Sequence, residues 1–261
     1  MTALRVFVFG GAFAYRALFN WIHPAMFIPA LIGLPLFQIV FFVYLGRSNG
    51  KEPDSFFIVG NAVQSCAMAS VYGSVMVIAN DRLFGTLPFV VTSPANRFAL
   101  FFGRAAPLVV NGLLISVFGF LAGRLLFDYS PVSSALPELL LVLVIVVASC
   151  TAFGLVIGTA GLRAREPILV AGLTYSLMLL LCGVNVPVDQ LPPGLEAVGR
   201  ILPLTHGIAA ARELATGADL GDVSGSILAE VAIGGVYAAV AFVLFRVVEA
   251  RARRDGTLEA I

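Results

Sequence analysis

The stretch Leu136–Ala160, LPELLLVLVIVVASCTAFGLVIGTA, contains a single charged residue, Glu138, which lies near its start. About 20 apolar residues in a helix are enough to cross the hydrocarbon core of a bilayer, which is about 30 Å thick. The run is also too long and too continuous for a barrel strand, whose hydrophobic residues alternate with polar ones. It therefore predicts a transmembrane helix.

The rest of the chain has the same character. Hydrophobic residues make up 59% of it and charged residues only 12%, whereas soluble domains contain about 25% charged residues. Only helices satisfy the backbone of an isolated span in lipid, so we expect a single all-α integral membrane domain, residues 1–261, with six transmembrane helices. The six runs are residues 24–45, 56–79, 98–122, 136–160, 167–183 and 231–248.

The basic residues fix the expected orientation. If the spans alternate in direction, eleven of the 16 Lys and Arg residues share one side with the N-terminus. The positive-inside rule then predicts a multi-pass protein of the cell membrane with both termini in the cytoplasm. Residues 80–97 and the tail 249–261 become cytoplasmic, and 184–228 becomes extracellular. The eleven are Arg5, Arg16, Arg82, Arg97, Arg104, Arg163, Arg165, Arg246, Arg251, Arg253 and Arg254, and the other five are Arg47, Lys51, Arg124, Arg200 and Arg212.

Residues 1–23 precede the first predicted span, and Gly10-Gly11 leaves their apolar core very short. Arg5 and Arg16 fall nearly on one helical face, and Trp21 suits the depth of the lipid headgroups, so we expect an interfacial helix. The alternative is a secretory signal peptide cleaved after the small residues Ala12-Phe13-Ala14.

The connection at 184–228 is longer than a passive loop requires. Apolar residues at helical spacing predict two short helices, at 194–202 and 205–215. Neither can cross a bilayer, so we expect both to be re-entrant or interfacial.

The spans contain few polar groups. No Asp, Glu, His or Lys lies in the middle of a predicted span, and Glu230 is expected near the outer end of the last one. A proton- or ion-coupled transporter normally keeps such residues within its spans, so the sequence disfavours that class of transporter. The polar residues that remain form either interhelical hydrogen bonds or part of a substrate path, and the candidates for a path are Asn61, Gln64, Thr174 and Tyr175.

Small residues recur at a spacing of four, in Gly119 with Gly123 and in Gly154 with Gly158. Gly234 and Gly235, with nearby alanines, give the last span a small face. Such patterns predict close approach between membrane helices.

Several functions are excluded or disfavoured by what the sequence lacks. Residues 46–51 only loosely resemble a phosphate-binding loop, so the chain should not hydrolyse ATP. His23 and His206 are expected on opposite sides of the membrane, which disfavours a catalytic site. No basic run is dense enough for nucleic acid. The cysteines lack metal-ligand spacing and are predicted to be packing residues, and they are Cys66, Cys150 and Cys182.

Three motifs give the chain a specific resemblance. The first comprises Asp81-Arg82, residues 84–87 (Phe-Gly-Thr-Leu) and residues 92–94 (Thr-Ser-Pro). The second is Val-Pro at 186–187 followed by Leu-Pro at 191–192. The third is Leu-Pro-Leu-Thr-His-Gly at 202–207 followed by Arg212. Their order resembles permease subunits of ABC-2 type exporters, which include daunorubicin-resistance, polysaccharide and lipid exporters. The chain departs from the family pattern at Pro88 and Leu202.

The resemblance implies a non-catalytic subunit that binds no cofactor itself. Two copies of a separate ATPase would bind ATP and Mg²⁺ and dock from the cytoplasm, and a second permease, identical or related, would complete a path lined by the first, second and fifth spans. The implied coupling residues are Asp81, Arg82, Leu83, Phe84, Gly85, Thr86 and Leu87, and the implied re-entrant motif is Pro203, Leu204, Thr205, His206 and Arg212.

Pro88 leaves the form of the coupling segment open. The helix either begins at about Leu87, with Pro88 in its first turn, or consists of two pieces joined there. A solvated loop with one helical turn is the alternative.

The resulting functional hypothesis is ATP-driven export of an apolar or amphipathic small molecule, such as a drug, an antibiotic or a lipid-like compound. Export of a polysaccharide or lipid-linked glycan is the first alternative. An ATP-independent channel or membrane scaffold is the second, and a membrane enzyme acting on lipid is a weaker third.

Overall fold

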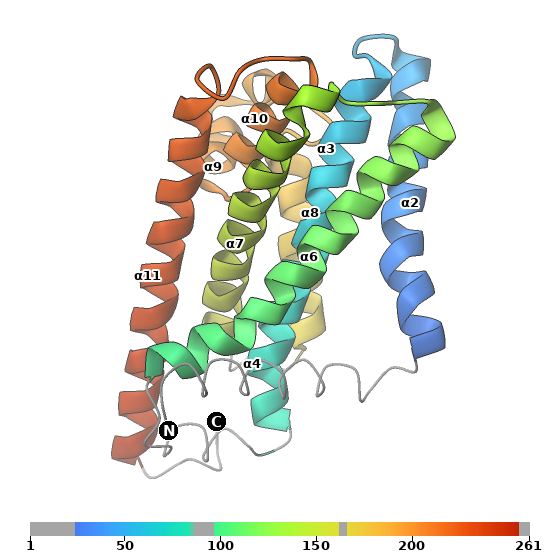
Figure 1. Ribbon diagram of the computed structural model, residues 1–261. Coiled ribbons are helices and arrows are strands. Elements are labelled where there is room, and N and C mark those ends of the chain that lie inside the picture. The colour runs from blue at the N-terminus through green and yellow to red at the C-terminus, as the bar shows by residue number, and fades with distance from the viewer. Residues whose placement is uncertain (1–23, 84, 86–96, 162–165, 256–261) are drawn as a thin grey trace.

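The computed structural model describes residues 24–83, 85, 97–161 and 166–255, and within these ranges it contains helices and no strand. The predicted all-helical class is confirmed. Figure 1 shows long helices running side by side, with two short ones, α9 and α10, gathered at the end where α3 begins. The helices are α2 (Pro24–Asn49), α3 (Asp54–Ala67), α4 (Gly73–Leu83), α6 (Arg97–Phe127), α7 (Leu136–Ala160), α8 (Pro167–Leu181), α9 (Pro193–Ile201), α10 (Thr205–Ala215) and α11 (Ser224–Asp255).

Four stretches of the described residues are long and apolar enough to cross a membrane, namely Asp54–Asn80, Ala105–Phe127, Leu136–Ala160 and Ser224–Val248. Two further apolar helices lie beside them, α2 with 26 residues and α8 with 15. At 1.5 Å per residue, α8 is roughly 22 Å long, which is shorter than a typical hydrocarbon core.

Several helices extend beyond the apolar runs that predicted them. The helix α6 continues to Phe127, five residues past the expected end at 122, and α11 begins at Ser224 and continues to Asp255, within the expected tail. Hydropathy marks the part of a helix that lipid covers, whereas the backbone hydrogen bonds continue into the polar zones on either side. The N-terminal residues 1–23, for which an interfacial helix is expected, lie outside the described residues.

The second apolar run is not one regular helix. A turn of π-helix, Met68–Tyr72, separates α3 from α4. Such turns insert a residue into an α-helix and are frequent at functional sites. Nothing in the apolar pattern of this run signals the insertion.

Glycines set the closest helix contacts in the bundle. A Cβ atom built on Gly154 of α7 would lie 2.9 Å from the Cα of Val71, and one on Gly158 would lie 3.0 Å from the Cα of Val75. A Cβ on Gly119 of α6 would lie 2.9 Å from the Cα of Ala62. Only hydrogen fits at these positions, so the close approach predicted from the glycine spacing is confirmed.

The principal hydrophobic core surrounds α7. It combines side chains from α3, α7, α8, α10 and the segment after α8. The three cysteines are buried as free thiols, Cys66, Cys150 and Cys182, so their predicted role in packing is confirmed.

Gly154→Ala should lower stability, because the new methyl group would overlap the backbone at Val71. Overpacking of this kind costs about 1–3 kcal/mol. Gly33→Ala in α2 is the matched control, since a Cβ there meets nothing within 4 Å. Thermal unfolding of the purified variants in one detergent measures the difference, and equal midpoints for both variants would contradict the packing argument.

Candidate functional site

A network of polar side chains joins α2, α3 and α8. The amide nitrogen of Gln38 donates to Oδ1 of Asn61 at 2.8 Å, and the hydroxyl of Tyr175 donates to Oε1 of Gln38 at 2.8 Å. Nδ2 of Asn61 donates to Oδ1 of Asn185 at 2.8 Å, and also to the carbonyl of Phe57 at 2.8 Å. Four side chains from three helices and the segment after α8 are therefore linked in one chain of hydrogen bonds.

The network holds these three helices together inside the bundle. Asn61 is completely buried, so each polar atom of its side chain needs a partner within the protein. Measured interhelical hydrogen bonds in membranes average about 0.6 kcal/mol each and reach about 1.7. Bonds of that size fix a preferred arrangement of the helices and can still be exchanged when the helices move.

The other predicted path residues take different positions. Gln64 is fully buried and neither of its amide atoms has a hydrogen-bond partner among the described residues. The hydroxyl of Thr174 donates to the carbonyl of Val170 in its own helix at 2.9 Å, so it joins no second helix. The structure thus brings Asn61 and Tyr175 into one network and leaves Thr174 bonded within α8.

The π-helical turn adds an aromatic group beside the network. The ring centroids of Tyr72 and Tyr175 are 6.3 Å apart. A Cβ on Gly172 of α8 would lie 2.9 Å from the hydroxyl of Tyr72, so the glycine makes room for that side chain. Amide and phenol groups therefore occupy neighbouring positions between α3 and α8.

Two members of the network, Gln38 and Asn185, were not among the predicted path residues. Gln38 is the only amide side chain in the run 24–45, and this isolation within an apolar run is a signal that could have identified it. Asn185 lies in the irregular segment between Gly183 and Pro187, where sequence gives no indication of which helix it will meet.

The short helix α10 is attached to this region through Arg212. Its guanidinium group donates to the carbonyl of Phe56 at 3.1 Å, of Gly183 at 2.8 Å and of Val184 at 2.8 Å. It also lies 3.5 Å from the centroid of the Phe56 ring. Arg212 therefore connects α10 to the start of α3 and to the segment that follows α8.

Burial lowers the pKa of the Arg212 guanidinium group to about 9, and the negative charge of Glu52 opposes part of this decrease. The group therefore remains protonated at neutral pH. Since its donors already face three backbone carbonyls, this arginine is a structural cation and is not available to bind an anionic ligand.

Glycine backbones make the Arg212 contact possible. A Cβ on Gly60 would clash with the carbonyl oxygen of Val184 and would lie 2.6 Å from Nη2 of Arg212. Gly183 has φ +75°, a left-handed conformation that other residues rarely adopt.

A carboxylate from α11 holds the other end of α10. Oε1 of Glu230 accepts a hydrogen bond from the amide of Leu204 at 2.8 Å, and Oε2 accepts one from the amide of Gly207 at 3.1 Å. Glu230 is only 1% exposed. The first amides of a helix have no partner within it, and the positive end of the helix dipole favours an anion there. Glu230 therefore caps α10 from a neighbouring helix.

The backbone at the start of α10 is strained. Leu204 has φ +89°, which is unusual for a residue with a branched side chain, and its side chain is fully buried. The hydrogen bond to Glu230 holds its amide in that position. The sequence alone predicts Glu230 near the outer end of its span and indicates no partner for it, because the pairing depends on how α10 folds back against α11.

The remaining residues of the predicted re-entrant motif join α10 to α9 and α8. The hydroxyl of Thr205 donates to the carbonyl of Gly199 at 2.6 Å, and Nε2 of His206 lies 3.0 Å from the carbonyl of Arg200. The carbonyl of Pro203 accepts from the Cys182 thiol at 3.5 Å. The motif therefore has a clear structural role in building the turn between α9 and α10.

Little of the predicted coupling segment can be placed. Asp81, Arg82 and Leu83 form the last residues of α4, and Gly85 follows in a turn with φ +64°. Phe84, Thr86 and Leu87 lie outside the described residues. Across the described ranges there is also no cluster of three or more His, Cys, Asp or Glu side chains suited to a metal ion.

Residues 54–243, from the start of α3 into α11, match the model of a family described as ABC-2 family transporter protein. No curated protein matches the chain.

Replacing Glu230 should loosen α10. Glu230→Ala leaves the buried amides of Leu204 and Gly207 without an acceptor, and each such loss costs about 1–3 kcal/mol. Glu230→Gln keeps one acceptor oxygen and should have an intermediate effect. We expect the order wild type, Glu230→Gln, Glu230→Ala in thermal stability.

The control for this series is Glu213→Gln, which removes an exposed carboxylate from α10 itself. It should leave the unfolding midpoint nearly unchanged. If Glu230→Ala unfolds at the same temperature as Glu213→Gln, the capping role of Glu230 is wrong.

Proposed function

Since this chain belongs to the ABC-2 transporter family and therefore provides the membrane permease of an ABC transporter, we propose that it exports an apolar or amphipathic small molecule from the cytoplasm. The observation that carries the proposal is the network of Gln38, Asn61, Tyr175 and Asn185 between α2, α3 and α8. These helices correspond to the first, second and fifth expected spans, which the family resemblance assigns to the cargo path.

The chemistry of the network supports this class of cargo. Its four side chains are neutral amides and a phenol, and Arg212, which contacts the segment that holds Asn185, is occupied by backbone carbonyls. An uncharged or weakly polar molecule can exchange hydrogen bonds with amides and contact the rings of Tyr72 and Tyr175. A strongly charged solute would find no counter-charge among these four side chains.

In this proposal α2 and α8 count as spans, which gives six with both termini in the cytoplasm. Two copies of a separate ATPase supply the energy, and a second permease, a copy or a relative, completes the path. ATP binding moves the segment 80–97, and α4 transmits the movement through the π-helical turn to α3. Displacement of Asn61 from Gln38 and Asn185 then opens the path between the helices.

The direct test is reconstitution of the permease with its ATPase in vesicles. The proposal predicts ATP-dependent efflux of amphipathic dyes or transfer of lipid, and copurification of the ATPase with the permease. Preferential movement of small ions would overturn it. Turnover of a lipid substrate without the ATPase would instead identify a membrane enzyme.

Tyr175→Phe should alter transport, because it removes the hydroxyl that donates to Gln38 and leaves the ring in place. Thr174→Val is the matched control in the same helix, since that hydroxyl bonds only within α8. We expect Tyr175→Phe to shift the cargo concentration for half-maximal efflux several-fold, with little change for Thr174→Val. Equal shifts in both variants would count against a role for the network in the path.

Gly85 should be sensitive to side-chain shape because of its φ of +64°. A β-branched residue is strained there, whereas Asn tolerates left-handed backbone, and the penalty for other residues is roughly 1–2 kcal/mol. We expect Gly85→Val to reduce efflux while ATP hydrolysis continues, and Gly85→Asn to remain close to wild type. Normal efflux by Gly85→Val would refute a coupling role for this turn.

A further inference from the structure

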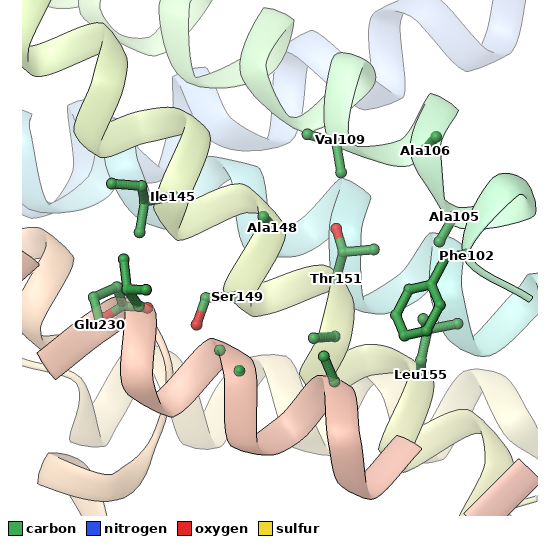
Figure 2. A pocket seen from close by; sticks show the side chains of 15 residues that line it. Phe102, Ala105, Ala106, Val109, Ile145, Ala148, Ser149, Thr151, Leu155 and Glu230 are labelled. Carbon is green, nitrogen blue, oxygen red and sulfur yellow. The ribbon is translucent and has the colours of Figure 1, made fainter. Parts of the chain in front are cut away.

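A hollow lies away from the polar network, between α6, α7 and α11. Its volume is about 430 Å³, within the range of small-molecule sites. Figure 2 shows Glu230 and Ile145 near one end of it and Phe102 and Leu155 near the other. None of these three helices contributes a side chain to the polar network.

This hollow, which we call the α6/α7/α11 groove, lies at the depth of the lipid hydrocarbon. Nearly all of its lining belongs to the apolar spans Ala105–Phe127, Leu136–Ala160 and Ser224–Val248. Only 6% of the most apolar stretch of α11 is buried, so this helix lies at the outside of the bundle. Ala148, Val231 and Gly235 line the groove and remain exposed. The groove therefore opens toward lipid.

Small side chains create the space. Gly234 contacts α7 directly, since a Cβ there would lie 3.2 Å from the Cα of Ser149, whereas a Cβ on the adjacent Gly235 would meet nothing within 4 Å. Ala105 and Ala152 continue the small lining on α6 and α7. One glycine thus brings the helices together while its neighbour leaves a gap beside the contact.

The lining offers little to a polar ligand. The hydroxyl of Thr151 donates to the carbonyl of Val147 at 2.7 Å, and both oxygens of Glu230 accept from the backbone amides of Leu204 and Gly207. The buried hydroxyl of Ser149 has no hydrogen-bond partner among the described residues, and most of the remaining lining surface is apolar. A sugar or a hydrated ion would lose more hydrogen bonds on entry than the groove can replace.

We propose that the α6/α7/α11 groove binds one acyl chain of a membrane phospholipid. Bilayer hydrocarbon surrounds an outward-facing hollow at this depth, and a void there would forfeit dispersion contacts along its walls. A chain that fills the groove recovers them. The site is separate from the cargo path and does not depend on the cargo proposed above.

The test uses the full permease with its ATPase in phosphatidylethanolamine vesicles that contain a small proportion of the same lipid with a diazirine in one acyl chain. After illumination, labelled peptides are identified by mass spectrometry. Label on the lining of α7 between Ala148 and Leu155 should exceed, by several-fold, label on the exposed face of α6 that includes Leu114, Val117 and Leu121.

Gly235 lines the groove and a Cβ there meets nothing within 4 Å, so Gly235→Leu adds a bulky side chain at the groove and should reduce the α7 label several-fold while leaving the α6 label unchanged. Gly33→Leu, the same change at another open glycine, should leave both labels unchanged. The α6 label also reports that each variant remains folded in the bilayer. Equal labelling of the two faces in the wild type, or α7 label that survives Gly235→Leu, would overturn the proposal. Absence of label from α7 alone would indicate that another polypeptide covers the groove, which would also overturn it.

Discussion

A helix that begins inside a membrane protein must find partners for its first amide groups, because no water is available to supply them. In this chain α10 meets that constraint with a carboxylate from another helix, Glu230 of α11. The carboxyl group of Glu230 lies at the positive end of the α10 dipole, where both of its oxygens accept hydrogen bonds from buried amides. The left-handed backbone of Leu204 is held in the same contact.

The attachment of α10 at two places ties distant helices together. Glu230 joins it to α11, and Arg212 joins it to the start of α3 and the end of α8. The segment 183–185 takes part in both the Arg212 contacts and the polar network. The carbonyl of Val184 accepts a hydrogen bond from Arg212, and the side chain of Asn185 accepts one from Asn61. In the proposed mechanism, a displacement of α3 that breaks the polar network would also strain the contacts of Arg212, and through α10 those of Glu230.

Apolar run length predicted the helical class and located the long helices, because burial in lipid imposes a strong and local compositional signal. The glycine pairs also predicted close helix contacts, because such a contact depends only on the glycine and the helix that faces it. The partners of Glu230 and Arg212 could not be predicted, because both depend on how the connection after α8 folds back. The role of Gln38 could have been predicted, because it is an isolated amide side chain within an apolar run. The coupling segment lies largely outside the described residues, so its assignment stays a prediction.

The π-helical turn at Met68–Tyr72 has a consequence for direction as well as for shape. An α-helix advances about 100° in azimuth with each residue, so one inserted residue rotates everything beyond it by about that angle. Asn61 and Gln64 lie before the turn, and Asp81 to Leu83 lie after it. The inserted residue therefore rotates α4 relative to α3 within a single span. The face of α3 that meets α2 and α8 does not by itself determine the direction in which the end of α4 points.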